Sequence, residues 1–202
     1  MYSNVAQWNN QAKEWLLQQD LQTVMLVEAH LRGIKQEQAK NALSRSRWQG
    51  SQCMRPDEGA PVEARFSAVE KGKRHIVSTN MTLMVMVSWQ MSCSWEIVLV
   101  SIYLKCGEDL NSPANSTVLG ALAAFLQELA VPWLVVGDFQ VPPERWEGRN
   151  LLNVLKAELA CSGQPTMING AEIDYLLASR KVAPFLDVKA CLLYTSPSPR
   201  DA

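Results

Sequence analysis

Short apolar runs that stop at a polar residue recur along the chain and predict many short β-strands. Runs rich in apolar and β-branched residues and bounded by turn formers are typical of buried or half-buried strands. They cover positions 1–6, 21–29, 61–69, 74–79, 81–92, 95–104, 133–136, 172–179 and 185–193. The runs at 81–92 and 95–104 are expected to form a hairpin. An Asn169–Gly170 pair predicts a two-residue turn leading into the run at 172–179.

Apolar positions at helical spacing predict helices between these strands. Such helices are expected at 8–19, 115–130 and 146–159. The segment 35–43, rich in Gln, Lys and Ala, is expected to be a solvated helix, and the polar segment 44–59 is expected to be a loop. The helix at 115–130 is the clearest, because its apolar residues form one stripe and Pro132 ends it. This order of elements predicts two β-layers with helices outside them.

The stretch from Val131 to Gln140 organises the chain. Its apolar run Trp133–Val136 ends abruptly at Gly137, so Asp138 stands where the end of a strand meets a loop. Strand side chains alternate between faces, so Asp138 and Gln140 are expected to reach one site. A carboxylate and an amide suit a hard divalent cation and a phosphate. A strand that simply ends in a turn would have the same pattern, so other residues must decide.

Two further carboxylates occupy comparable places. Glu28 stands at the end of the strand predicted at 21–29, and Asp174 stands in a row of apolar residues in the run at 172–179. A lone carboxylate in a buried strand is costly unless it is paired or binds a metal, so Asp174 is a functional candidate. The alternative is a generic α/β protein in which these acids lie in surface turns.

Composition narrows the class of protein. The chain has 202 residues, 48% of them hydrophobic, and a net charge of −1, which suits one domain with a sizeable core. The near-neutral charge predicts that any nucleic-acid contact is local or weak. Five cysteines without a Cys-x-x-Cys pair predict neither a disulfide framework nor a zinc site. With no membrane-length apolar run and no secretory pattern, an intracellular protein of the cytoplasm or nucleus, not secreted and with no membrane partner, is expected.

Five segments, taken in order, resemble the motifs of the endonuclease/exonuclease/phosphatase superfamily, which has the DNase I-like fold. They are Asn4–Val5, Val27-Glu28-Ala-His30-Leu31, Ser101-Ile-Tyr103, Gly137-Asp138-Phe-Gln140, and Thr166 with Ile173-Asp174-Tyr175. The motif that contains Glu28 and His30 favours the retrotransposon-type and related endonuclease-like members of this superfamily. The resemblance implies an α/β (α+β) fold, a four-layered sandwich of two packed mixed β-sheets flanked by helices. This would be one domain over 1–190, incomplete at both ends.

The resemblance also implies a chemistry, the hydrolysis of a phosphodiester with Mg²⁺ or Mn²⁺ as cofactor. Glu28 would be the chief metal ligand, with Asn4 as a second. The partner would be nucleic acid or another phosphodiester, and DNA, RNA, a nucleotide and a phosphoinositide all stay open. The oligomeric state stays open as well.

The other motif residues would act on water and phosphate. Asp138 would position or activate the attacking water, Gln140 and Tyr103 would contact the phosphate, and Asp174 would orient a catalytic histidine. Attack would be in line, with metal and histidine offsetting the charge on the phosphoryl oxygens.

The sequence departs from the family pattern in its histidines and at Gln140. Its two histidines, His30 and His75, both precede Asp174, whereas the family carries its catalytic histidine after the last strand. Losing general acid–base help costs about 10²–10⁴-fold in rate. Gln140 replaces the usual asparagine, and an amide displaced by about 1 Å can cost ~10²-fold. An impaired hydrolase is therefore expected; the alternative is an inactive relic of a mobile-element endonuclease or a non-enzymatic binding module.

Two remaining features are the tail and the tryptophans. Residues 191–202 are rich in Ser and Pro and are expected to be unstructured. They also resemble a translated library-adaptor sequence, which would make them an artefact. Most of the seven tryptophans fit a core. Trp48 and Trp146 stand in polar surroundings and are candidates for ligand contact, with packing still favoured.

Overall fold

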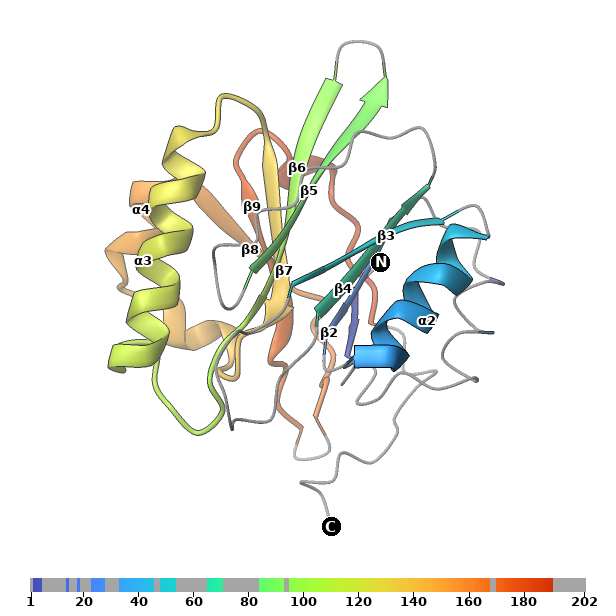
Figure 1. Cartoon of the computed structure of the whole chain (residues 1–202). Helices are drawn as coiled ribbons and strands as arrows, with labels where there is room; N and C mark the ends of the chain where they lie inside the picture. Colours follow the sequence, from blue (N-terminus) through green and yellow to red (C-terminus); the bar gives the residue numbers. More distant parts are fainter. Residues whose placement is uncertain are drawn as a thin grey trace.

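Two β-sheets form the centre of the computed structural model, which describes residues 2–4, 14, 18, 23–27, 33–45, 48–53, 65–70, 84–92, 95–167 and 170–190 (Figure 1). The first sheet has the order β1-β2-β4-β3, with β1 Tyr2–Asn4, β2 Thr23–Val27, β3 Trp48–Cys53 and β4 Arg65–Glu70. The second has the order β5-β6-β7-β9-β8, with β5 Met84–Ser92, β6 Trp95–Tyr103, β7 Trp133–Asp138, β8 Ala157–Ala160 and β9 Asp174–Ser179. Both are mixed, because β1 and β2 are parallel, β6 and β7 are parallel, and the other pairs are antiparallel.

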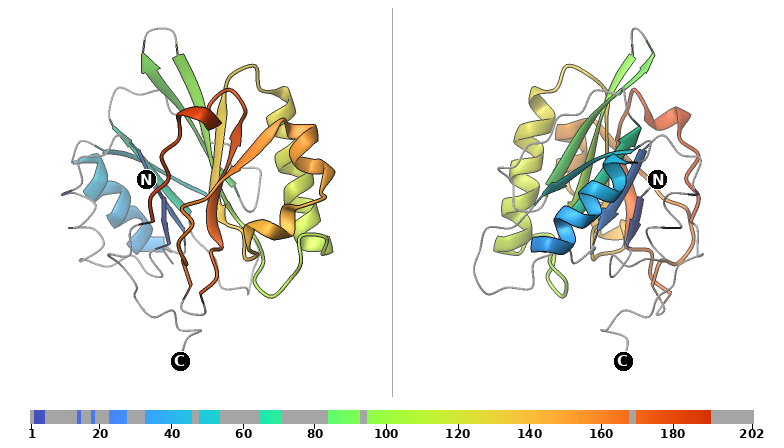
Figure 2. Two further views of the ribbon diagram at one scale, coloured as in Figure 1. Left: turned by 180° about the vertical axis from the view of Figure 1, so that it is seen from behind. Right: turned by 45° about the vertical axis from the view of Figure 1, so that its right-hand side comes forward.

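The sheets pack face to face between helices. Strand β1 contacts β7, β2 contacts β6, and β3 and β4 contact β5. Helix α2 (Gly33–Ser44) packs against β3, while α3 (Pro113–Glu128) and α4 (Asn150–Leu155) cover the far face of the second sheet (Figures 1 and 2). The predicted four-layered α/β sandwich is therefore confirmed. No helix in the described part of the chain has the length and apolarity that a membrane span requires.

Strand β6 supplies alternate side chains to two apolar layers, as a strand buried on both faces does. Val98, Val100 and Ile102 of β6 lie in the layer that β6 shares with β7 and the buried stripe of α3. The other residues of this layer include Val118, Leu122, Leu126, Trp133 and Val135. The other layer faces the first sheet and includes Ile97, Leu99 and Val136. Helix α3 starts where Ser112 Oγ accepts from Asn115 N at 3.2 Å and Pro113 takes the first helical position.

Several elements predicted from sequence differ in the structure. The expected loop at 44–59 contains strand β3. The helix expected at 146–159 is present only as α4, Asn150–Leu155: a 3₁₀ turn η1 covers Pro143–Trp146 before it, and Ala157–Ala160 is the edge strand β8. The helix ends because Lys156 takes a left-handed backbone with φ 51°.

The segments around and after the predicted Asn169–Gly170 turn agree only in part. Backbone hydrogen bonds join the residues on either side of the turn, from Gly170 N to Met167 O at 3.1 Å and from Thr166 N to Ala171 O at 2.9 Å, and the strand that follows, β9, pairs with β7 and β8. The expected strand at 185–193 is replaced by a 3₁₀ turn η2 at Ala183–Phe185 and irregular chain over 186–190. Of the helix predicted at 8–19 only Glu14 and Gln18 are described, both helical. The run at 74–79, Asn169 and the 191–202 tail lie outside the described residues.

Candidate active site

Three of the predicted site residues stand in one row across the second sheet. Tyr103 at the end of β6 pairs with Asp138 at the end of β7, and Asp138 pairs with Asp174 at the start of β9. Residues in register on adjacent strands are about 5 Å apart and present their side chains on one face. Tyr103 is 2% exposed and Asp138 is 3% exposed, while Asp174 is half-buried. The row lies on the face that is turned toward the first sheet.

Gln140 joins this row by bending back toward it. Its backbone N–H donates to Asp138 Oδ1 at 3.1 Å, and its side-chain Nε2 donates to Asp138 Oδ2 at 2.6 Å. Both carboxylate oxygens of Asp138 thus accept from one residue. The sequence predicted this meeting from strand alternation, but the strand ends at Asp138 and the cause is the left-handed backbone of Gln140, φ 58°. That conformation costs a residue with a Cβ about 1–2 kcal/mol.

Thr166 fixes the start of β9. Its Oγ1 accepts from Ile173 N at 2.9 Å and from Asp174 N at 3.2 Å. Ile173 O in turn accepts from Phe139 N at 2.9 Å, which ties the end of β7 to the same segment. A side-chain hydroxyl that satisfies two backbone donors sets where a strand begins. Thr166 therefore places Asp174 beside Asp138.

A buried aromatic group lies next to the Asp138 loop, on the face of the sheet that carries α3. The rings of Phe139 and Tyr175 are stacked with centroids 4.4 Å apart, and Trp146 meets Phe139 edge-on at 5.8 Å. Trp146 is 1% exposed, in agreement with the packing interpretation of this tryptophan. The side chain of Trp48 lies outside the described part.

Asn115 organises the loop that follows Tyr103, and the sequence did not point to it. It is fully buried (0% exposed). Its Oδ1 accepts from Lys105 N at 2.8 Å, and its Nδ2 donates to the carbonyls of Glu108 and Asp109 at 3.3 and 3.2 Å. A polar residue in the first turn of an amphipathic helix is the signal that could have identified it, because a buried amide must find partners.

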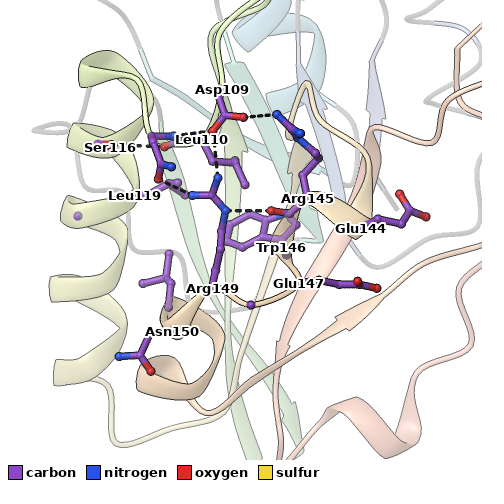
Figure 3. Close-up of a pocket in the computed structure, with 14 residues that line it drawn as sticks. Asp109, Leu110, Ser116, Leu119, Glu144, Arg145, Trp146, Glu147, Arg149 and Asn150 are labelled. Atoms are coloured by element: carbon purple, nitrogen blue, oxygen red, sulfur yellow. Dashed lines mark hydrogen bonds and ion pairs between the residues drawn. The ribbon is translucent and has the colours of Figure 1, made fainter.

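An open groove of about 1020 Å³ lies between this loop, α3 and η1 (Figure 3). Arg145 and Arg149 both bind Asp109, at 2.5 and 3.0 Å, whereas Glu144 and Glu147 point away from it (Figure 3). The backbone N–H of Asn111 and then the Arg145 guanidinium lower the pKa of the Asp109 carboxyl. This ion-pair cluster ties the loop after β6 to η1 after β7.

The two predicted metal ligands are less fully described. Asn4 ends β1 opposite Val27 on the parallel strand β2. Glu28 comes directly after Val27 in the sequence but lies outside the described residues, as do His30 and His75. Within the described ranges no group of three or more His, Cys, Asp or Glu side chains could hold a metal ion.

Comparisons with known proteins identify the fold. A scan of protein-family models and a search of curated proteins find no match to this sequence. Among solved structures, the endonuclease domain of TRAS1, a telomere-specific non-LTR retrotransposon, is similar with a TM-score of 0.69 and 14% identity over 93% of this chain and 87% of that one. An endonuclease/exonuclease/phosphatase family protein from Bacteroides thetaiotaomicron is similar with a TM-score of 0.62 and 14% identity over 89% and 82%. AP endonuclease LMAP from Leishmania major has a TM-score of 0.61 and 15% identity over 91% and 79%.

At these identities the matches establish fold rather than activity. The chain has the DNase I-like fold of the endonuclease/exonuclease/phosphatase proteins. The fold implied by the motifs is confirmed, and the solved structures that share it include the endonuclease domain of a retrotransposon.

Proposed function

We propose that this chain is a metal-dependent phosphodiester hydrolase of the endonuclease type, with its catalytic domain over 1–190. The observation that carries the proposal is the row Tyr103–Asp138–Asp174, joined by Gln140, on a DNase I-like fold. Nucleic acid is the favoured substrate, because the similar solved structures include a retrotransposon endonuclease domain and an AP endonuclease.

In the proposed reaction each residue of the row has one task. The Asp138 carboxylate orients the attacking water and takes its proton. Tyr103 and the Gln140 amide supply hydrogen-bond donors that hold a phosphate oxygen in line with that water. Asp174, half-buried at the start of β9, provides a fixed negative charge that would orient a cationic or imidazole partner.

The donor chemistry of the remaining residues fits Mg²⁺ or Mn²⁺. A glutamate carboxylate and an asparagine carbonyl are the oxygen ligands that these hard cations prefer. Glu28 and Asn4 would hold the ion, and Asn4 already stands opposite the residue that precedes Glu28. When bound, such an ion neutralises charge that develops on the phosphoryl oxygens.

A second candidate is a weakened or inactive enzyme that only binds its partner. Gln140 Nε2 lies 2.6 Å from Asp138 Oδ2, so an attacking water must compete with this amide for the carboxylate. In addition, both histidines of the sequence precede Asp174, whereas the resemblance places the catalytic histidine after it.

Cleavage of plasmid DNA and of a single-stranded oligonucleotide, measured in MgCl₂ and in EDTA, separates the two candidates. Cleavage that needs MgCl₂, disappears in Glu28→Ala and persists in the exposed control Glu128→Ala is the expected result. DNA binding without cleavage would establish the inactive alternative.

Gln140→Asn is expected to raise both stability and activity. Asparagine tolerates the left-handed backbone better than glutamine, so unfolding should cost about 1 kcal/mol more. Its shorter amide should leave Asp138 Oδ2 open to water, and cleavage should rise by up to about 10²-fold. Urea unfolding and initial cleavage rates measure the two effects.

Lys156→Asn is the matched control, since Lys156 is the other described non-glycine residue with positive φ, at 51°. It should stabilise the fold by a similar amount and leave cleavage unchanged. A Gln140→Asn variant that gains only stability would show that the glutamine amide does not hinder the carboxylate.

A further inference from the structure

The buried Tyr175 hydroxyl joins η1 to the loop that carries the candidate site. It accepts a hydrogen bond from Trp146 Nε1 at 2.6 Å and donates one to Val141 O at 3.0 Å. Tyr175 and Trp146 are 2% and 1% exposed, so neither bond competes with bulk water. This chain of two bonds ends on the residue that follows Gln140.

Tyr175 also holds the residue that precedes Gln140. Its ring stacks on Phe139 with centroids 4.4 Å apart and planes 12° from parallel. Phe139 is fully buried, and its other neighbour in the group is the edge of Trp146. Gln140 is thus bracketed by two residues that contact one tyrosine.

Gln140 needs such support because its left-handed backbone is disfavoured for a residue with a Cβ, and the surrounding structure must impose it. The direction in which its amide points depends on that backbone. The backbone of Tyr175 is itself held in place, because Tyr175 pairs with Gly137 in the β7–β9 ladder and directly follows Asp174.

The hydroxyl keeps its proton under ordinary conditions. Burial, opposed only in part by the hydrogen bond from Trp146, raises the pKa of Tyr175 well above its usual value. The donor to Val141 O is therefore present throughout the neutral and moderately alkaline range.

We propose that Tyr175 and Trp146 are positioning residues that hold Gln140 in its left-handed conformation, so that its amide meets Asp138. The inference rests on the proposed function for its consequence in catalysis, but its structural content is independent of activity. Neither residue touches the reacting atoms; both act through the backbone of Phe139 and Val141.

Tyr175→Phe and Trp146→Phe test the inference, because each removes one hydrogen-bonding group and keeps an aromatic ring. The first readout is the side-chain amide resonance of Gln140 in ¹⁵N-labelled full-length chain, identified by its loss in Gln140→Ala. In both variants this resonance should move toward the value of a solvent-exposed glutamine and its protons should exchange faster. The double variant should move the Gln140 resonance no further than the stronger single variant does, because Trp146 and Tyr175 belong to the same chain of hydrogen bonds.

The second readout is cleavage kinetics. Because Gln140 Nε2 competes with the attacking water for Asp138 Oδ2, release of the amide in Tyr175→Phe and Trp146→Phe should raise kcat by up to about 10²-fold, as in Gln140→Asn, with little change in KM. Trp133→Phe is the matched control: this tryptophan is also buried, at the opposite end of β7, and its replacement should leave the Gln140 resonance in place.

An unchanged Gln140 resonance in Tyr175→Phe and Trp146→Phe would overturn the inference, whatever happens to stability. A wild-type chain that cleaves nothing would refute the proposed function. The Gln140 resonance would still decide whether Tyr175 and Trp146 are positioning residues. A shifted Gln140 resonance with unchanged kcat would show that Tyr175 and Trp146 hold Gln140 in place, and it would refute the proposed consequence for catalysis.

Discussion

Gly137→Ala is expected to destabilise the fold by about 3 kcal/mol or more, at the upper end for an added buried methyl group. A Cβ at position 137 would overlap the carbonyl oxygen and the Cγ2 atom of Ile102, and would lie 3.0 Å from the carbonyl carbon. Two of these three atoms belong to the backbone of β6, so no side-chain rotation relieves the clash. The parallel strands β6 and β7 would have to separate at Ile102–Gly137, one step before Tyr103 and Asp138.

Urea unfolding of wild type and Gly137→Ala measures this effect, with Gly120→Ala as the matched control. A Cβ at Gly120 meets nothing within 4 Å, and this glycine lies inside α3. Its replacement by alanine should stabilise the protein by about 1 kcal/mol through helix propensity. The two substitutions add the same methyl group and should have opposite signs. A Gly137→Ala variant as stable as wild type would mean that β6 and β7 do not approach as closely as the structure has them.

The sequence predicted best where hydrophobic pattern and burial coincide. Helix α3 and strands β6 and β7 were placed correctly because each has an apolar face or run that the core requires. Strand β3 was missed because its sequence Trp-Gln-Gly-Ser-Gln-Cys has no apolar alternation, and its pairing is supplied by β4. The helix predicted at 146–159 was too long because apolar Leu159 and the alanines beside it also suit a strand, and the ladder with β9 decides between them.

The candidate site shows the same division between local and long-range information. Motif order placed Tyr103, Asp138 and Asp174 together, and the register of three strands does so in the structure. Sequence reasoning brought Gln140 to Asp138 for the wrong reason, because a left-handed residue cannot be foreseen from alternation. The bonds of Asn115 and Tyr175 join residues that lie far apart in sequence or in different elements, so only the folded chain reveals them.

Asp138→Asn is expected to lower cleavage by about 10²–10⁴-fold, the usual loss when a general base is removed. Asparagine keeps the size of the side chain but replaces one acceptor oxygen by a donor. Both oxygens of Asp138 accept from Gln140, so one of these bonds would become a contact between two donors unless the glutamine amide turns over. An amide that turns over keeps stability near wild type, whereas one that cannot should cost about 1–3 kcal/mol. Single-turnover cleavage and urea unfolding measure the two consequences separately.

Glu158→Gln is the control for removing a carboxylate from the second sheet. Glu158 is exposed on the edge strand β8 and pairs with Arg180 at 3.9 Å, which contributes little to stability at a solvated surface. Its replacement should change neither rate nor stability appreciably. If Asp138→Asn kept the wild-type rate while Glu28→Ala abolished it, the attacking water would be activated by the metal site alone. Asp138 would then be a structural acceptor that holds Gln140. The row across β6, β7 and β9 would bind the phosphate, and none of its residues would take the proton of the attacking water.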